Sequence, residues 1–292
     1  MMLKTGDLEV FKAVAESGSL SGAAARLHCV QSNVTARIKG LEAQLGTALF
    51  YRKPRGISLT PGGRALMSYA ETILRLLEEA EQAVSDLDGR GGSLRLGSME
   101  TTAAVRLPTP LARYHEAFPE VEIMLSTGTT EALVERTLAF EIDGAFVAGA
   151  IEHPDLVCEP IFVEELVLVT EPGCRRPEAL KRRALLVFRE GCTYRTWAEQ
   201  WARASGLLPI RLMEFGTLDG ILGCVGAGMG MTLLPRAVVE RSGYRGRFAI
   251  HPLPAGSAVL PTCFIRRKDA LMTGAMSGFL EMVGQVAIAD SG

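Results

Sequence analysis

The feature that most constrains the fold of this 292-residue chain is a long segment without helix breakers, from residue 62 to about residue 88. After its two initial glycines it contains no further glycine and no proline. Apolar residues recur in it at alternating steps of four and three: Leu66, Ala70, Ile73, Leu77, Ala80, Val84 and Leu87. This 3.5-residue period is typical of a coiled-coil seam. The segment predicts a linker helix that joins two copies of the chain; the alternative is a helix that packs on its own domain.

The linker helix divides the chain into parts of different charge. Residues 89–93, Gly-Arg-Gly-Gly-Ser, follow it and predict a flexible hinge. Residues 1–65 carry nine lysines and arginines against four acidic residues, although the whole chain has a net charge of −2. A basic module on an acidic body favours a polyanionic partner for the basic module alone. We therefore predict three parts: residues 1–61, residues 62–92 and residues 93–292.

Residues 1–61 have the pattern of a helix-turn-helix. Apolar residues at helical spacing predict a first helix that stops near residues 17–19, and Ser21 is a suitable N-cap for a second helix over residues 22–27. The apolar residues of a third helix recur at steps of four, three and four, and a glycine follows the last of them. These residues are Val34, Ile38, Leu41, Leu45 and Gly46.

The exposed face of the third helix carries short polar side chains, and a basic hairpin follows it. Amides and hydroxyls at a helix start are suited to reading base edges in the major groove of DNA, while Arg and Lys reach phosphates. Two extended segments around a Pro-Arg-Gly turn predict a wing beside the helices. The alternative is a solvated amphipathic helix followed by an ordinary hairpin. The predicted DNA-binding residues are Gln31, Ser32, Asn33, Thr35 and Arg37 on the helix, and Arg52, Lys53 and Arg55 on the wing.

Taken together, these residues resemble the LysR-type transcriptional regulators. The matching motifs are Ala23-Ala24-Ala25-Arg26-Leu27, Gln31-Ser32-Asn33-Val34-Thr35-Ala36-Arg37-Ile38, Leu41-Glu42, Leu45-Gly46, Leu49-Phe50, Arg52 and Leu59-Thr60-Pro61-Gly62-Gly63. The resemblance implies an all-α winged helix-turn-helix DNA-binding domain whose base-contacting helix starts at Gln31. It also implies a sequence-specific regulator of transcription that binds double-stranded DNA at a dyad-symmetric promoter site. A dimer through the linker helix, further paired into a homotetramer, and RNA polymerase as a further candidate partner belong to the same expectation.

Strand-like and helix-like segments alternate over residues 93–292, which predicts an α/β architecture with parallel sheets. The resemblance extends more loosely over this part and implies an effector-binding domain of two periplasmic-binding-protein-like lobes that share a cleft. We place lobe one at about residues 93–166 plus 267–292, and lobe two at about residues 167–266. In such sheets ligands bind beyond the carboxyl ends of strands, where helix N-termini offer N–H groups.

Hydroxyl groups and an arginine follow four of the predicted strands. Together with backbone N–H groups they suit a carboxylate or another small anion. The alternative for each threonine is a helix N-cap. Glu100 would repel an anion, so we expect it to face solvent or to contact an amine on the ligand. The predicted effector-binding residues are Ser98, Thr101, Thr102, Gly128, Thr129, Thr193, Arg195 and Thr217.

Other classes of function lack support in the sequence. No signal-peptide pattern and no apolar run of roughly 20 residues occurs, so we expect a cytoplasmic protein without a membrane partner. The cysteines and histidines lack metal-ligand spacing, and Gly226-Ala227-Gly228-Met229-Gly230 lacks the final glycine of a dinucleotide-binding motif, so we predict no metal and no cofactor. Without a visible acid/base cluster we expect no enzyme. A solute-binding protein would have no use for residues 1–65, and a redox role of Cys192 or Cys224 is a further alternative.

Overall fold

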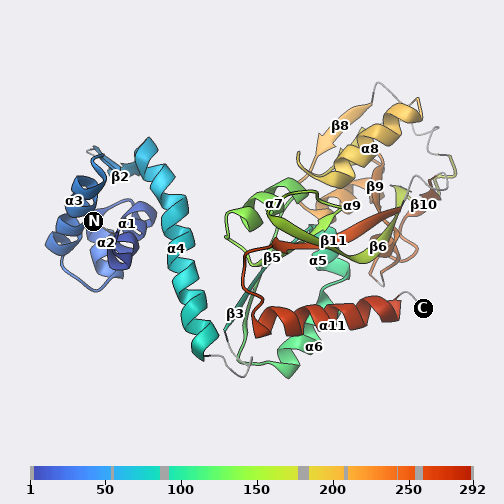
Figure 1. The fold of residues 1–292 in the computed structure, drawn as a ribbon. Helices are drawn as coiled ribbons and strands as arrows, with labels where there is room; N and C mark the ends of the chain where they lie inside the picture. Colours follow the sequence, from blue (N-terminus) through green and yellow to red (C-terminus); the bar gives the residue numbers. More distant parts are fainter. Residues whose placement is uncertain are drawn as a thin grey trace. The chain divides into compact units, whose positions relative to one another are not determined.

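A computed structural model describes residues 3–53, 56–85, 92–176, 184–206, 210–241, 243–253 and 259–290. Its internal contacts divide the chain into two compact units, residues 1–87 and 88–292, which we treat separately (Figure 1). Arg55 of the predicted wing, Leu87 of the predicted seam and residues 89–91 of the predicted hinge lie outside the described residues.

The first unit begins with three helices and a two-stranded hairpin. Gly18 and Gly46 adopt positive φ angles of 64° and 67° and end the first and third helices, as the sequence predicts. The hydroxyl of Ser19, rather than the predicted Ser21, accepts a hydrogen bond from Gly22 N and caps the second helix. Leu8, Phe11, Val34, Ile38 and Leu41 form the buried centre of this unit. The elements are α1 (Thr5–Ser17), α2 (Leu20–Arg26), α3 (Gln31–Leu45), β1 (Phe50–Lys53), β2 (Gly56–Leu59) and α4 (Pro61–Ser85).

The linker helix α4 divides the predicted seam between two environments. Ala70 is fully buried in the core of the first unit, and Leu66 and Ile73 pack against that core. Leu77 is 41% exposed, although it belongs to the same apolar repeat. Packing on the first unit therefore accounts for the apolar repeat from Leu66 to Ile73. The second half of the repeat begins with the exposed Leu77.

The second unit is built around a seven-stranded sheet with the order β10-β6-β11-β5-β3-β4, in which β9 also pairs with β6. The strands β3, β4 and β5 pair in parallel, as do β7 and β8 in a separate two-stranded sheet. All pairs of β6 and β11 are antiparallel, which departs from the purely parallel expectation. The strands are β3 (Ser93–Ser98), β4 (Glu122–Thr127), β5 (Gly144–Ala148), β6 (Leu156–Thr170), β7 (Ala184–Val187), β8 (Arg211–Glu214), β9 (Thr232–Pro235), β10 (Ala249–Pro252) and β11 (Val259–Arg267).

Helices cover both faces of these strands. α6 and α11 lie side by side and pack with Phe146, Phe264 and Phe279 into one core cluster (Figure 1). A second cluster joins α7 to α8, because Leu133, Tyr194 and Ala198 belong to the same buried group. The helices of this unit are α5 (Glu100–Val105), α6 (Pro108–Ala117), α7 (Thr130–Leu138), α8 (Thr193–Ala204), α9 (Leu218–Gly226), α10 (Arg236–Glu240) and α11 (Gly274–Asp290).

The strand β6 belongs to two halves of the sheet. Residues 156–165 pair with β11, whereas residues 166–170 pair with β9 and β10. The chain thus passes from one lobe to the other along a single strand. The predicted second lobe extends to residue 266, but β11 pairs with β5 as well as with the first half of β6, so residues 259–266 belong to the sheet of the first lobe. Strand periodicity indicates that a strand is present, not which sheet it joins.

Candidate functional site

The exposed start of α3 carries three of the predicted DNA-binding residues. Gln31, Ser32 and Asn33 are exposed, and their side chains make no hydrogen bond among the described residues. Thr35 donates a hydrogen bond from Oγ1 to the carbonyl oxygen of Gln31, at 2.9 Å, which orients its side chain along the helix. Within the described part of the chain these three polar side chains lack a protein partner, as reading base edges would require.

Arg37 is engaged within the protein. Its Nη1 donates to the carbonyl oxygen of Gly6 at 2.9 Å, and its Nε lies 3.5 Å from the carboxylate of Asp7. The side chain is still 44% exposed, so it joins the start of α1 to the exposed face of α3. Arg52 and Lys53 lie on β1, the first strand of the wing.

The wing is attached to the helices by residues of the Leu-Glu and Thr-Pro-Gly-Gly motifs. Glu42 Oε1 accepts hydrogen bonds from Leu49 N at 2.9 Å and from Phe50 N at 3.4 Å. Thr60 donates from Oγ1 to the carbonyl oxygen of Ala48 and accepts from Gly63 N, so it joins the wing to the start of α4. A Cβ atom at Gly63 would lie 2.1 Å from the carbonyl oxygen of Leu49, which requires glycine there. The Leu-Glu and Thr-Pro-Gly-Gly motifs therefore hold the wing against α3 and the start of α4.

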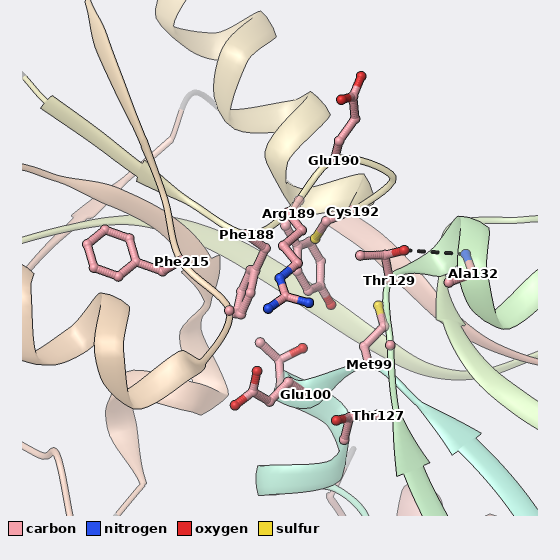
Figure 2. Close-up of a pocket in the computed structure, with 14 residues that line it drawn as sticks. Met99, Glu100, Thr127, Thr129, Ala132, Phe188, Arg189, Glu190, Cys192 and Phe215 are labelled. Carbon is pink, nitrogen blue, oxygen red and sulfur yellow. Dashed lines mark hydrogen bonds between the residues drawn. The ribbon is translucent and has the colours of Figure 1, made fainter. Parts of the chain in front are cut away.

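A cavity of about 440 Å³ lies in the second unit, where segments of the two lobes meet (Figure 2). This volume is in the range of small-molecule sites, roughly 300–1,000 Å³. The lobe-one wall comes from the start of α5 and the turn between β4 and α7, and the lobe-two wall from the turns before α8 and α9. The cavity is lined by Met99, Glu100, Thr101, Thr127, Gly128, Thr129, Ala132, Phe188, Arg189, Glu190, Cys192, Tyr194, Phe215 and Gly216.

Three of the predicted effector-binding residues line this cavity: Thr101, Gly128 and Thr129. Thr129 is also the N-cap of α7, and its Oγ1 accepts from Ala132 N at 3.3 Å (Figure 2). The ligand contact and the N-cap, which the sequence leaves as alternatives, therefore concern the same hydroxyl. Its second lone pair and its own proton are available to a ligand.

The other five predicted residues have protein partners or stay outside the cavity lining. Ser98 is buried and donates to the carbonyl oxygen of Met99, and Thr102 is buried near Arg106 and Glu164. Thr193 donates to the carbonyl oxygen of Ala148 at 3.2 Å. Arg195 binds the carboxylates of Glu199 and Glu214, both at 2.8 Å, and Thr217 caps α9 by accepting from Gly220 N.

The cation that lines the cavity is Arg189, which the sequence analysis does not identify. Its side chain makes no hydrogen bond and no ion pair among the described residues. Its Nη2 lies 3.0 Å from the position a Cβ atom would take at Gly216, so glycine leaves room for the guanidinium beside the turn before α9. Figure 2 shows the guanidinium pointing into the cavity between Phe188 and the residues of α5. An arginine two residues beyond a buried strand is the signal that could have identified it.

Glu100 connects the two walls of the cavity, and Tyr194 is buried in the lobe-two wall. Oε1 of Glu100, at the start of α5, accepts a hydrogen bond of 3.0 Å from Leu218 N at the start of α9. Tyr194 is 3% exposed, and burial raises the pKa of its phenol well above the ordinary value, with the carboxylate of Glu164 adding to the shift. The phenol therefore stays protonated and can donate a hydrogen bond within the cavity wall.

Cys192 is a buried thiol of this site. Burial raises its pKa above the ordinary value of 9.0, which outweighs the hydrogen bonds from Arg195 N and Tyr194 N. A thiol that remains protonated is a poor nucleophile, so the environment does not favour redox chemistry. Cys224, the other candidate, packs against the hydrophobic cluster around α9 and does not line the cavity.

Two kinds of feature are absent from the part of the chain that the structure describes. In that part no three His, Cys, Asp or Glu side chains are grouped so that they could hold a metal ion. None of its helices is long and apolar enough to cross a membrane.

The fold and the site define a class: a winged helix-turn-helix followed by a linker helix and a two-lobed domain with a cavity between the lobes. The model of the bacterial regulatory helix-turn-helix protein, lysR family, matches residues 5–64, and that of the LysR substrate binding domain matches residues 87–287. The chain belongs to the LysR family of DNA-binding transcriptional regulators, as the sequence motifs predict. This family consists of transcriptional regulators and not of enzymes.

Relatives match over nearly the whole chain. The HTH-type transcriptional regulator GltR of Bacillus subtilis is 48% identical over 94% of this chain and 93% of its own length. The HTH-type transcriptional regulator CzcR of Bacillus thuringiensis is 41% identical over 97% of this chain and 94% of its own length. The crystal structure of full-length CbnR complexed with its target DNA has a TM-score of 0.72 and 25% identity, and it covers 98% of this chain and 100% of that chain.

Proposed function

We propose that this LysR-family regulator binds a dyad-symmetric promoter site and that a small anionic effector, bound in the cavity between its lobes, controls this binding. The observation that carries the effector half is Arg189: a guanidinium in a cavity of about 440 Å³ without a partner among the described residues. Arginine is always charged and binds carboxylates in two-point geometry, so its preferred partner is an anion from solution.

The DNA-binding half rests on the exposed start of α3. Gln31, Ser32 and Asn33 would read base edges, with Thr35 on the next turn of the same helix. Arg37, Arg52, Lys53 and Arg55 would contact the phosphate backbone, and Arg37 would exchange part of its contact with Gly6 and Asp7 for a phosphate oxygen. The DNA-bound structure of CbnR supports this assignment by analogy of fold.

The assembly that fits this function is a dimer through the exposed half of α4, further paired into a homotetramer through the two-lobed domains. Two recognition helices could then meet successive major grooves about one helical turn apart. The domain division that we propose keeps residues 1–61, 62–92 and 93–292, with residues 259–266 moved to lobe one. A regulator of chromosomal DNA acts in the cytoplasm, and RNA polymerase is the partner through which it would alter transcription.

The effector acts on DNA binding only if it binds one arrangement of the two lobes more tightly than another. Hydrogen bonds join the lobes at Glu100 with Leu218 N, Thr193 with Ala148 O, and Glu131 N with Gly191 O, beside the apolar cluster that α7 and α8 share. An anion between Arg189 and Thr129 would add attraction between walls that come from different lobes. This coupling links the occupancy of the cavity to lobe packing and then to the spacing of the DNA-binding domains.

The DNA-binding half is tested by capture of fragmented genomic DNA from the source organism with the purified full-length protein. We expect a few enriched promoters that share a dyad with half-sites about one turn apart. Gln31→Ala should lose about 1–3 kcal/mol of specific binding while non-specific binding stays unchanged. Equal losses of specific and non-specific binding would contradict the base-reading role of α3.

A further inference from the structure

The cavity between the lobes holds side chains of opposite charge that are not paired with each other. The charged side chains that line it are Arg189, Glu100 and Glu190. Figure 2 shows the carboxylate of Glu190 pointing away from the other two, whereas Arg189 points toward the part of the cavity where Glu100 lies. No ion pair joins Arg189 to Glu100 among the described residues. The cavity therefore presents one cation and one anion to whatever it contains.

Both charges are held at the same turn, just before α9. Arg189 lies against Gly216, with Nη2 3.0 Å from the position of a Cβ atom there. Glu100 is half-buried, and its Oε1 accepts the hydrogen bond from Leu218 N two residues further along. Oε2 of Glu100 has no hydrogen-bond partner among the described residues. One carboxylate oxygen fixes the side chain to α9, and the other can accept from a ligand.

A ligand that carries only negative charge fits this arrangement poorly. Its carboxylate would satisfy Arg189, but the half-buried carboxylate of Glu100 would repel it and would remain without a counter-charge. A ligand that also carries a protonated amine would satisfy both side chains at once. The hydroxyls of Thr127 and Thr129 and the aromatic rings of Phe188 and Phe215 complete the lining and suit a small polar or apolar side chain.

We propose that the effector is amphoteric: a small amino acid or a related molecule whose carboxylate binds Arg189 and whose ammonium group binds Glu100. This inference rests on the proposed function, because it deepens the identity of the ligand of the same cavity. Glu100 is then a residue that selects the ligand, and not only a contact between the lobes.

The experiment measures binding to the full-length protein by thermal shift and by titration calorimetry. The probes are the twenty proteinogenic L-amino acids, the matching acids that lack the amine, and the matching amines that lack the carboxylate. Glu100→Gln removes the charge but keeps a carbonyl oxygen that can accept from Leu218 N, so it preserves the contact to α9. Glu135→Gln is the matched control, because it makes the same chemical change on an exposed glutamate of α7 that does not line the cavity.

We expect at least one amino acid to raise the melting temperature, and its deaminated and decarboxylated counterparts to bind at least tenfold more weakly. Glu100→Gln should weaken binding of the amino acid tenfold or more, whereas Glu135→Gln should change it less than threefold. A deaminated acid that binds as tightly as its amino acid, or an amino acid that binds Glu100→Gln unchanged, would overturn the inference and leave the proposed effector site intact.

The two proposals fail in distinguishable ways. If no probe binds, the amphoteric ligand is refuted, and the low-molecular-weight fraction of a cell extract is then added to the same assay. A shift by that fraction which Arg189→Gln removes would keep the anion site of the proposed function. A shift that Arg189→Gln leaves unchanged, or no shift at all, would refute the anion site as well.

Discussion

The buried ion pair between Arg106 and Glu164 allows a stability prediction with its own control. Arg106, which follows α5, donates from Nε and Nη2 to the two carboxylate oxygens of Glu164 at 2.9 and 3.1 Å. The side chains are 16% and 5% exposed. Arg106→Met would leave the carboxylate of Glu164 buried without its counter-charge, which costs about 3–5 kcal/mol. For a unit of this size, that corresponds to a fall in melting temperature of roughly 6–20 °C.

The neighbouring residue of β6 provides the control. Glu165 forms the same two-point pair with Arg236, at 2.6 and 2.9 Å, but these side chains are 46% and 31% exposed. The hydrogen bond from Arg236 lowers the pKa of Glu165, yet solvent screens this pair, so Arg236→Met should cost less than about 1 kcal/mol. Both variants are compared by urea denaturation of the full chain.

A double variant separates the loss of the ion pair from a general packing defect. Arg106→Met combined with Glu164→Leu replaces both charges by apolar groups, which is often neutral for a buried pair. We expect the double variant to recover most of the stability that Arg106→Met loses. Equal losses for Arg106→Met and Arg236→Met, or no recovery in the double variant, would refute the reasoning that burial sets the strength of this pair.

Three further predictions concern the two units separately. Gly63→Ala should destabilise the winged helix by more than about 2 kcal/mol in thermal denaturation, because its Cβ atom would meet the carbonyl oxygen of Leu49. A stability within roughly 0.5 kcal/mol of the unmodified chain, the range of surface substitutions, would contradict this. Cys192 should react with iodoacetamide at pH 8 more slowly than the half-buried Cys174, because burial raises the pKa of Cys192 and lowers its thiolate fraction. Peptide mass spectrometry gives both rates, and equal rates in the folded protein would contradict the burial argument. Leu77→Glu on the exposed side of α4 should shift sedimentation toward smaller species, since a charge in a coiled-coil seam disfavours association. An unchanged sedimentation profile would contradict the proposed dimer.

The helices of the first unit could be predicted from local sequence because their signals are local. Apolar periodicity and a terminal glycine define α3, and Gly46 ends it as expected. The sequence predicts Ser21 as the cap of α2, whereas Ser19 forms it, since both serines precede the alanine run and the choice depends on which one reaches Gly22 N. The path of the apolar stripe along α4 depends on the rest of the unit, which sequence periodicity alone does not contain.

The effector site was predicted less well because it is assembled from segments that are distant in sequence. Hydroxyls after strand ends identified Thr101 and Thr129, but the same rule selected Thr193, which binds Ala148 O on the other lobe. The sequence analysis predicts Arg195 as the cation, but Glu199, four residues later on the same helix, is its ion-pair partner. Arg189 lies two residues beyond the end of β7, and the residues three and four positions after it, Cys192 and Thr193, are not acidic. Proximity to the strand end, and not to the helix start, was the informative signal.

The central claim is that the cavity with Arg189 is the effector site, and the most direct measurement compares two arginines. The melting temperature of the full-length protein is recorded with and without the low-molecular-weight fraction of a cell extract, for the unmodified chain, Arg189→Gln and Arg195→Gln. Both substitutions remove one guanidinium, but Arg195 is bound by Glu199 and Glu214 outside the cavity. We predict a ligand-induced rise that Arg189→Gln abolishes and Arg195→Gln retains. A rise that survives Arg189→Gln would contradict the account, whatever the result for Arg195→Gln.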